Sequence, residues 1–445
     1  MENRAGGLVM KRAAVVLLGG LILAGAALAE DLAPGVVLLA AIKHHMKEEL
    51  GRLPNVSCVE TVRREFQPAK GKMAPFDTVR LEVHTDGDKE LYASPGEREF
   101  SSAHPIDYAG SGVMANGYFG SHLKNVLEGT GVTFDYKGEA EIAGRRLARY
   151  DYRVSEMFGG QSFNLPEGTG TAGLHGSLWA DPRTYDVIRL EMSADGFPPT
   201  LPLTEAITRI DYARTVFDGG MSLLLPASGE FRMVKVSGET SHNQIEFTDC
   251  RLFQARSELS FDQPGSPAAP TLAAAAPSTN ENRPALPAGL RIDVKLRSRI
   301  SGNLAVGGLI EGVVASSVRV DGATLIAAGS PVHGRIRRLE RRTDPEPYFI
   351  VALEFTEVES QGIRYRFFAD LLELGSAPGV ERELSSGSTE SHSLPGGPGA
   401  RIEKRKWDKT WLPDLPGAAS FFVRGAGLDL PPGFHTVWKT RPVTP

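Results

Sequence analysis

Apolar and polar residues alternate along much of the chain between residues 55 and 261, and this alternation predicts β-strands. In residues 78–85 every second side chain is apolar, and Asp86-Gly87-Asp88 leads into another alternating run at residues 89–93. A period of two places the apolar side chains on one face of a strand. An Asp-Gly pair between two such runs is typical of a β-hairpin.

Further strands are predicted by the same alternation at residues 55–66, 133–136, 146–154, 176–180, 187–194, 208–216, 221–225, 231–236 and 244–261. Before them, Val36, Leu39 and Ile42 recur at helical spacing, and Pro54 marks the end of the predicted helix. A second helix is expected at residues 118–127. We therefore expect one large, curved antiparallel sheet with a few helices laid on it.

The last third of the chain is more purely β in its pattern. Strands are predicted at residues 290–296, 309–314, 330–339, 349–358 and 363–372, with turns such as Asp321-Gly322 and Gln361-Gly362 between several of them. Five or six strands of this length are typical of a small β-barrel or sandwich.

Two segments lack any apolar period and divide the chain. Residues 264–285 are rich in Pro, Ala, Ser and Asn, which is typical of a linker. We expect a first domain at residues 31–262, a linker at 263–285 and a second domain at 286–445. Residues 375–399 are rich in Ser, Gly and Pro, and a long disordered loop is expected there within the second domain.

The start of the chain has the pattern of a secretory signal peptide. Lys11 and Arg12 precede an uncharged run at residues 13–28, and Ala27-Leu28-Ala29 offers small residues at the positions that a signal peptidase reads. An uncleaved anchor is the alternative, but the run of about 16 residues is short for a bilayer core, which needs about 20. We expect residues 1–29 to be removed after Ala29, a periplasmic or secreted protein, and no transmembrane segment after cleavage.

Residues 176–191 form the most characteristic hairpin of the first domain. An apolar strand ends in Asp181-Pro182, and the return strand carries Arg189. Together with the signal-like start, the first helix and the long antiparallel meander, this hairpin resembles the periplasmic lipoprotein-carrier superfamily, with its LolA-like and RseB-like domains. The resemblance covers residues 31–262 and implies an open half-barrel of antiparallel strands, with a few helices, around an apolar concave face.

The second domain carries two motifs of another family. Leu286-Pro-Ala-Gly-Leu290 and, later, Ala327-Ala-Gly-Ser-Pro-Val-His-Gly334 resemble the outer β-domain of TrbI-type bacterial envelope proteins. In that family the first motif has Thr where this chain has Leu290, and the second has Pro where this chain has Ala327. The resemblance implies a compact β-domain at residues 286–445.

Composition narrows the classes of function. Hydrophobic residues at 41% and charged residues at 23% are ordinary for a globular protein. The net charge of -5 gives no reason to expect nucleic acid or an anionic membrane surface as a partner. With 49 Gly and 30 Pro, turns must be frequent, which favours many short strands over long helices.

Cys58 and Cys250 are the only cysteines of the chain. An oxidising compartment permits a disulfide between them, since an even count leaves no unpaired thiol; the alternative is two separately buried thiols. Cys58 lies on the first predicted strand and Cys250 on the last strand before the linker. We expect these strands to approach each other as the curved sheet bends towards closure.

Three further groups of residues have a spacing or a density that can indicate a functional site. Ser121 and Lys124 have the spacing of penicillin-recognising serine enzymes, but the accompanying motifs of those enzymes are absent from the sequence. His44 and Glu48 are a candidate metal pair without a visible third ligand. The arginines between residues 335 and 342 are interpreted as a solvated strand end. We therefore expect no enzyme, no cofactor and no catalytic, cofactor-binding or metal-binding residues.

Two functions remain open at this point. The first is an exported, non-enzymatic envelope protein that binds an apolar ligand, a lipid or a lipidated partner in a concave β-sheet. The alternative is a structural or assembly protein of the bacterial cell envelope that acts through protein–protein contacts. An apolar cavity of ligand size would favour binding, whereas a concave face packed with side chains would favour assembly.

Overall fold

The computed structural model describes residues 32–252 and 283–442, apart from 88, 98, 102–103, 156–159, 344–345 and 382–416. The signal peptide expected at residues 1–29 lies outside the described residues. So do most of the expected linker at 263–285 and most of the loop expected at 375–399. What is described is mainly β, as the alternation predicts.

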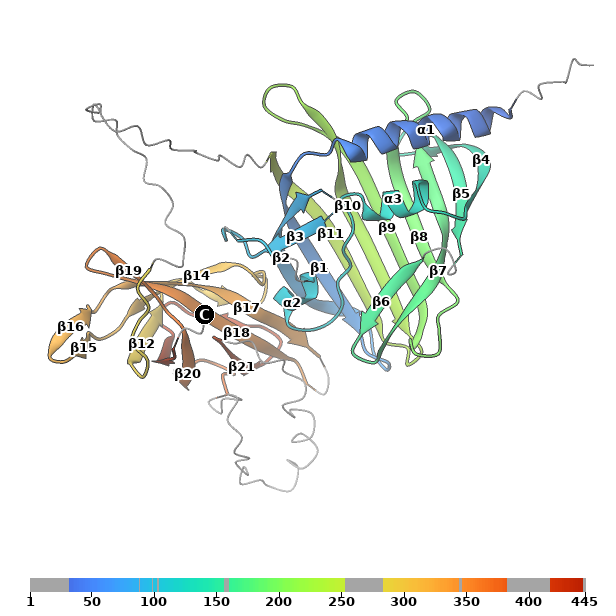
Figure 1. Ribbon diagram of the computed structural model, residues 1–445. Coiled ribbons are helices and arrows are strands. Elements are labelled where there is room, and N and C mark those ends of the chain that lie inside the picture. The colour runs from blue at the N-terminus through green and yellow to red at the C-terminus, as the bar shows by residue number, and fades with distance from the viewer. Residues whose placement is uncertain are drawn as a thin grey trace, which may run out of the picture.

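The first half of the chain forms an 11-stranded antiparallel sheet in the order β3-β2-β1-β11-β10-β9-β8-β7-β5-β4, with β6 paired to β7. Figure 1 shows this sheet in blue to yellow-green. Its strands are β1 (Val56–Gln67), β2 (Ala74–Asp86), β3 (Lys89–Ala93), β4 (Val132–Ile142), β5 (Arg145–Val154), β6 (Gln161–Leu165), β7 (Gly168–Ala180), β8 (Val187–Asp195), β9 (Leu203–Val216), β10 (Ser222–Lys235) and β11 (Thr240–Leu252).

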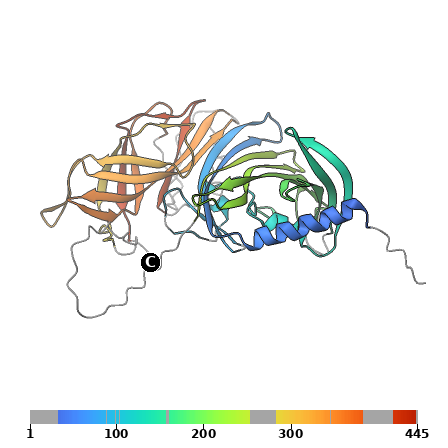
Figure 2. The same ribbon diagram turned by 90° about the horizontal axis from the view of Figure 1, so that it is seen from above.

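Seen from above, the sheet curls into a half-barrel, and helix α1 (Pro34–Gly51) lies across its open side (Figure 2). Ile42 and Met46 of α1 are buried. Of the two shorter helices, α2 (Pro105–Ala109) lies against β2 and β17, and α3 (Ser121–Leu127) lies against α1. No helix in the described part of the chain is long and apolar enough to cross a membrane.

The sequence predicts most strands of this sheet, but β6 has no predicted counterpart, and two further details differ. The predicted strands at 221–225 and 231–236 are one strand, β10, with a register irregularity between Pro226 and Ser228. A bulge absorbs the residue that breaks the alternation, so the strand continues past it. The first and last strands meet without closure of the sheet: β1 pairs directly with β11, and the free edges are β3 and β4.

A disulfide joins Cys58 on β1 to Cys250 on β11, as expected for this pair. The two Cα atoms are 4.0 Å apart. The register between the strands shifts between Ser57 and Val59, and Asp249 has a φ of 50°. The bond therefore lies at a bulge between two neighbouring strands, at the end of the half-barrel near α1.

The second half forms an 8-stranded sheet in the order β19-β18-β17-β14-β12-β23-β20, with β21 paired to β18. Its core includes the edge-to-face aromatic rings of Phe355, Phe367 and Trp438. The strands of this half are β12 (Arg291–Leu296), β13 (Ile300–Ser301), β14 (Leu309–Val314), β15 (Val318–Val320), β16 (Ala323–Ile326), β17 (Pro331–Arg342), β18 (Tyr348–Ser360), β19 (Ile363–Arg366), β20 (Ala369–Leu374), β21 (Ala418–Arg424), β22 (Asp429–Leu430) and β23 (His435–Thr440).

The predicted strand at 363–372 is wrong as a single element, because β19 and β20 divide it. The chain turns at Phe367, whose side chain enters the core beside Phe355. β19 then pairs with β18, and β20 pairs with β23 on the other side of the sheet. An unbroken apolar run does not reveal such a change of partner.

Backbone hydrogen bonds join the two sheets. The amide of Arg80 on β2 donates to the carbonyl of Val306 at 2.9 Å, and the amide of Val306 donates to that of Thr78 at 2.8 Å. On its other side, Gly307 donates to Ile336 of β17. The segment that contains Val306 therefore covers the edge of β2 that β3 leaves free.

A buried network of charges reinforces this joint from the side of the first sheet. Arg64 on β1 donates to both carboxylate oxygens of Asp77 on β2, at 2.5 and 2.7 Å, and both side chains are almost fully buried. Arg64 also donates to the carbonyl of Ser111 at 2.6 Å. The hydroxyl of Ser111 in turn donates to Glu340 on β17 at 2.5 Å.

The interpretation of the arginines at 335–342 as a solvated strand end is wrong. Arg338 is fully buried and pairs with Glu340, which also binds Arg342 at 2.5 Å. Arg335 is buried, and its guanidinium lies 3.0 Å from the carboxylate of Glu97, which belongs to the first half of the chain. Burial acts to raise the pKa of Glu340, but Arg342 and Arg338 outweigh burial and hold that pKa below its ordinary value.

Candidate functional site

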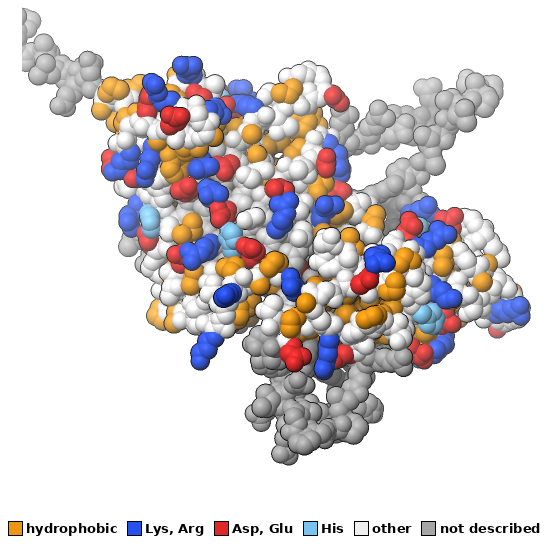
Figure 3. Space-filling view, turned by 180° about the vertical axis from the view of Figure 1, so that it is seen from behind, with side chains coloured by type: hydrophobic (Ala, Val, Ile, Leu, Met, Phe, Trp, Pro, Cys, Tyr) orange, Lys and Arg blue, Asp and Glu red, His pale blue; other side chains and the backbone are white. Residues whose placement is uncertain are grey.

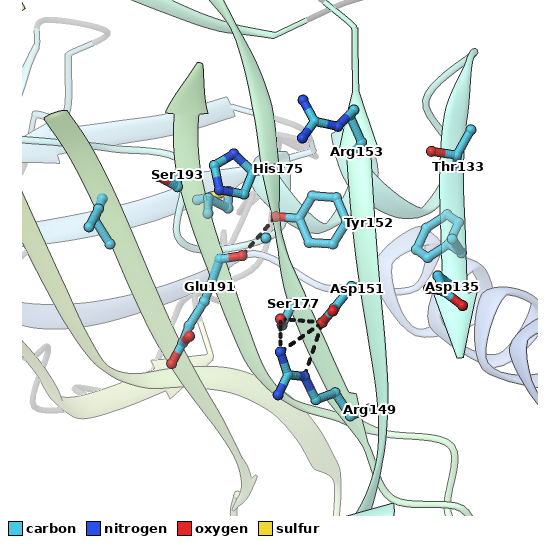
Figure 4. A pocket seen from close by; sticks show the side chains of 14 residues that line it. Thr133, Asp135, Arg149, Asp151, Tyr152, Arg153, His175, Ser177, Glu191 and Ser193 are labelled. Carbon is cyan, nitrogen blue, oxygen red and sulfur yellow. Dashed lines mark hydrogen bonds and ion pairs between the residues drawn. The ribbon is translucent and has the colours of Figure 1, made fainter. Parts of the chain in front are cut away.

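A shallow groove of about 590 Å³ lies on the outer, convex face of the half-barrel, over β4, β5, β7 and β8. Figure 4 shows that Arg149, Asp151 and Ser177 point toward one another. Arg149 and Ser177 both donate to Asp151, at 3.0 and 2.7 Å. The phenol of Tyr152 donates to the carbonyl of Glu191 at 2.9 Å.

These groups belong to a row of ion pairs across the outer face of the sheet. His175 and Arg153 share Asp195, at 2.6 and 3.1 Å. Further along, Arg189 pairs with Asp211 at 2.6 Å. Side chains that satisfy one another in this way are typical of a solvated sheet face. We therefore do not assign the outer groove a function.

A second cavity, of about 490 Å³, lies between β3, α3, β6 and β7. We call it the mouth cavity. Its lining is mainly polar, and one buried apolar side chain, Leu174 of β7, contributes to it. Glu90, Gly117, His122, Gln161 and Leu174 are among its lining residues.

Glu90, at the start of β3, organises one wall of the mouth cavity. Its carboxylate accepts hydrogen bonds from the amides of Gly117 and Phe119, at 2.7 and 2.8 Å. It also accepts one from the phenol of Tyr92 at 2.6 Å. On the same wall, a ring nitrogen of His122 lies 2.8 Å from the carbonyl of Asn116. These bonds hold the loop before α3 against the sheet.

Behind Glu90 lies a buried polar cluster on the concave face, formed by Glu60, Tyr92, Tyr118 and Tyr212. Both carboxyl oxygens of Glu60 and the phenol oxygen of Tyr118 are buried and have no hydrogen-bond partner among the described residues. Tyr212 donates to the carbonyl of Tyr118 at 3.2 Å. Buried polar atoms without a partner are costly, and they occur mainly where water or a ligand completes them.

Burial also changes the titration of the cluster. Desolvation, aided by the nearby Glu90, raises the pKa of Glu60 to about 8. Desolvation raises the pKa of Tyr92 and Tyr118 well above the ordinary value of tyrosine. At neutral pH the Glu60 carboxyl is therefore mostly protonated, and the cluster offers hydrogen bonds from neutral groups.

Desolvation lowers the pKa of His122, although Glu90 and the bond to Asn116 act in the opposite direction. The imidazole is therefore neutral at neutral pH, and Lys89 and Glu90 are the other titratable side chains that line the mouth cavity. Such a wall is suited to hydrogen bonding with the polar part of a ligand.

The candidates from the sequence do not converge on one site. His44 pairs with Glu48 at 3.7 Å on the exposed face of α1, whereas His45 lies 2.9 Å from Asp186 at the sheet. No group of three His, Cys, Asp or Glu side chains able to hold a metal occurs in the described ranges. Ser121 lies on α3 and lines the mouth cavity.

Sequence reasoning missed Glu60, although the pattern contained a signal. Cys58, Glu60 and Val62 share one face of β1, and the apolar neighbours place that face toward the core. A carboxyl in the apolar phase of a strand is unusual enough to mark a site. Glu90 carried no comparable signal, because it follows a turn.

Comparison with known proteins gives structural likenesses and no sequence match. No protein-family model matches the chain, and no curated protein matches it. A solved LolA superfamily protein from Nitrosomonas europaea is similar at 11% identity over 49% of this chain and 94% of that chain, with a TM-score of 0.22. An outer membrane lipoprotein-sorting protein domain from Vibrio parahaemolyticus is similar at 10% identity over 50% of this chain and 93% of that chain, with a TM-score of 0.25.

A third solved structure is ComB10 of the Com type IV secretion system of Helicobacter pylori. It is similar at 13% identity over 35% of this chain and 86% of that chain, with a TM-score of 0.19. Both resemblances expected from the sequence thus have counterparts among solved structures. At these identities and TM-scores the likenesses are general and carry no information about a ligand or a partner of this chain.

Proposed function

We propose that this chain is a non-enzymatic binding protein of the bacterial cell envelope. Its mouth cavity would hold the polar end of an amphiphilic molecule, either a lipid or the lipidated end of a protein. The observation that carries the proposal is the position of the mouth cavity beside buried polar groups, Glu60 and Tyr118, that have no hydrogen-bond partner among the described residues. The pattern of residues 1–29 supports an envelope location.

The size and lining of the mouth cavity fit this ligand class. About 490 Å³ lies within the range of about 300–1,000 Å³ that small-molecule sites occupy. Glu90 and Gln161 provide polar contacts, and Leu174 provides an apolar one. Hydrogen bonds would fix the head group of an amphiphile, and burial of its adjacent carbons would add about 25 cal/mol per Å².

A structural or assembly role is the second candidate, and one observation favours it. Helix α1, helix α3 and buried side chains such as Tyr118 and Tyr150 fill much of the concave face. The phenol of Tyr150 donates to the carbonyl of Gly35 in α1 at 2.8 Å. A concave face closed by its own helices is rigid and suits a scaffold.

Native mass spectrometry of protein purified from the envelope separates the two candidates. The binding protein carries a co-purified amphiphile, and Gln161→Trp on the cavity wall removes it. Gln244→Trp is the matched control, because Gln244 is exposed on β11, away from the mouth cavity. Two results would contradict the binding proposal: wild-type protein without any bound molecule, or the same fraction of ligand-bound protein in both variants. Either result would favour the assembly role.

A further inference from the structure

Exposed apolar side chains gather at the end of the half-barrel that carries α1. Leu32, Val36 and Val37, at the start of that helix, are 68%, 52% and 53% exposed. Tyr136 of β4 is also exposed and packs beside Gly35. Figure 3 shows hydrophobic side chains at this end of the molecule.

Two turns at the same end add further apolar side chains. Tyr185 lies in the turn between β7 and β8, and Val216 and Met221 flank the turn between β9 and β10. Val216 is 71% exposed. Figure 1 shows both turns rising beside α1. We call Leu32, Val36, Val37, Tyr136, Tyr185, Val216 and Met221 the α1-end patch.

Ion pairs attach α1 firmly to this end, so the α1-end patch is a property of the folded protein. Arg214 on β9 donates to Glu49 of α1 at 2.7 Å and to Asp186 at 2.5 Å. His45 of α1 lies 2.9 Å from the same Asp186. Single exposed apolar side chains are ordinary, but several at one end of a fold mark an interaction surface.

We infer that the α1-end patch docks the protein on the surface of a lipid bilayer. The described chain begins at this end with Leu32, and the uncharged residues 13–28, which have the pattern of a segment that enters the membrane during export, precede it in the sequence. The α1-end patch is therefore the part of the fold that follows most closely in the chain on a membrane-entering segment. The inference rests on the proposed function, since a protein that holds an amphiphile needs a route between bilayer and cavity.

The charges around the α1-end patch indicate whether it binds the charge of the lipid head groups or the apolar interior of the bilayer. Lys47 and Glu48 lie together on the exposed face of α1, and Arg183 and Asp218 lie in the two turns. Both signs are present, so no basic surface selects anionic lipid. Burial of apolar side chains at the interface would provide the binding, and added salt should change it little.

The test is vesicle flotation of the chain from Glu30 to Pro445, which contains every described residue. Phosphatidylcholine vesicles are used, and Val36→Glu combined with Val37→Glu should lower the partition coefficient at least about tenfold. Met221→Glu, in a different element, should lower it as well. The control is Val236→Glu, because Val236 is 68% exposed in the turn between β10 and β11 at the opposite end.

Unchanged partition of the double variant, no flotation of the wild type, or an equal loss in Val236→Glu would overturn the inference. Thermal unfolding of each variant confirms that the fold is retained. Native mass spectrometry of the double variant keeps the two proposals apart. If the double variant still carries a ligand in the mouth cavity and still binds vesicles as the wild type does, the docking inference is wrong. The proposed function is then not contradicted.

Discussion

Glu60 couples the titration of one carboxyl group to the stability of the fold. Its pKa is raised to about 8 in the folded protein, from 4.5. Between these values the unfolded chain releases a proton that the folded chain keeps. The free energy of unfolding therefore falls as pH rises from about 4.5 to about 8, by on the order of 4–5 kcal/mol for one isolated group.

Glu60→Gln should remove this dependence, because an amide fits the same space and does not ionise. We expect its unfolding free energy, measured by urea denaturation at pH 5 to 9, to fall less with pH than that of the wild type. Glu246→Gln is the matched control. Arg63 lowers the pKa of Glu246, so its contribution is lost only below pH 4.5 and the slope above pH 5 should not change. Identical slopes for wild type and Glu60→Gln would show that Glu60 is ionised in the fold.

The sequence could predict the pairing of the two cysteines, but it could not predict the burial of the charged residues on β17. Cys58 and Cys250 could be paired because no other cysteine competes. Arg338 and Glu340 could not, because a strand with charged residues on both faces normally indicates solvent. Both are buried, and the other half of the chain contacts both: Ser111 donates to Glu340, and Gly110 lies beside Arg338.

The position of helix α1 on the half-barrel depends on side chains that lie far away in the sequence. Asp186 accepts hydrogen bonds from Arg214 at 2.5 and 3.0 Å, and its side chain is nearly buried. Burial acts to raise the pKa of Asp186, but Arg214 and His45 outweigh burial and lower it. The anchored helix closes the open side of the half-barrel (Figure 2).

Arg214→Ala should loosen α1, because it leaves Asp186 with His45 as its remaining partner near the helix. We expect a loss of about 1–3 kcal/mol in unfolding free energy and faster hydrogen exchange in residues 36–50. Arg232→Ala removes a more exposed pair with Glu205 and should cost at most about 1 kcal/mol. Equal costs, with unchanged exchange in α1, would show that the helix is held by its apolar face alone.

Alternation predicted most strands of the first sheet, because these strands have one face on a core. It did not predict β6 of that sheet, or β21 and β23 of the second. Where pairing depends on distant segments, it failed: the separate strand at 231–236 is part of β10, and the strand at 363–372 divides at Phe367. The mouth cavity was not predicted either. Its walls come from β3, α3, β6 and β7, and only the folded sheet brings them together.

For the whole molecule, the two halves are joined by more than the chain between them. Val306 extends the edge of β2, and Glu340 links Ser111 of the first half to Arg338 and Arg342. Removal of one member of a buried ion network costs about 3–5 kcal/mol, because the others stay buried. We therefore propose two domains, with a boundary within 253–285, that stay together after cleavage.

A protease site inserted between residues 264 and 282 tests this arrangement. After cleavage the halves should elute together in size-exclusion chromatography, and Glu340→Gln should make them separate. Asp429→Asn is the control, because Asp429 on β22 pairs with Arg299 on the surface of the second half of the chain. Separation of the unmodified halves would show that the joint is too weak to hold them.

We propose that the mouth cavity, and not the outer groove, receives an amphiphile. Photo-crosslinking with a diazirine-bearing monoacyl phospholipid, mapped by peptide mass spectrometry, distinguishes the two sites. We expect crosslinks in residues 116–125 and 161–174, reduced in Gln161→Trp and retained in Gln244→Trp. Crosslinks concentrated in residues 133–153, which line the outer groove, or spread without preference over the surface, would contradict it.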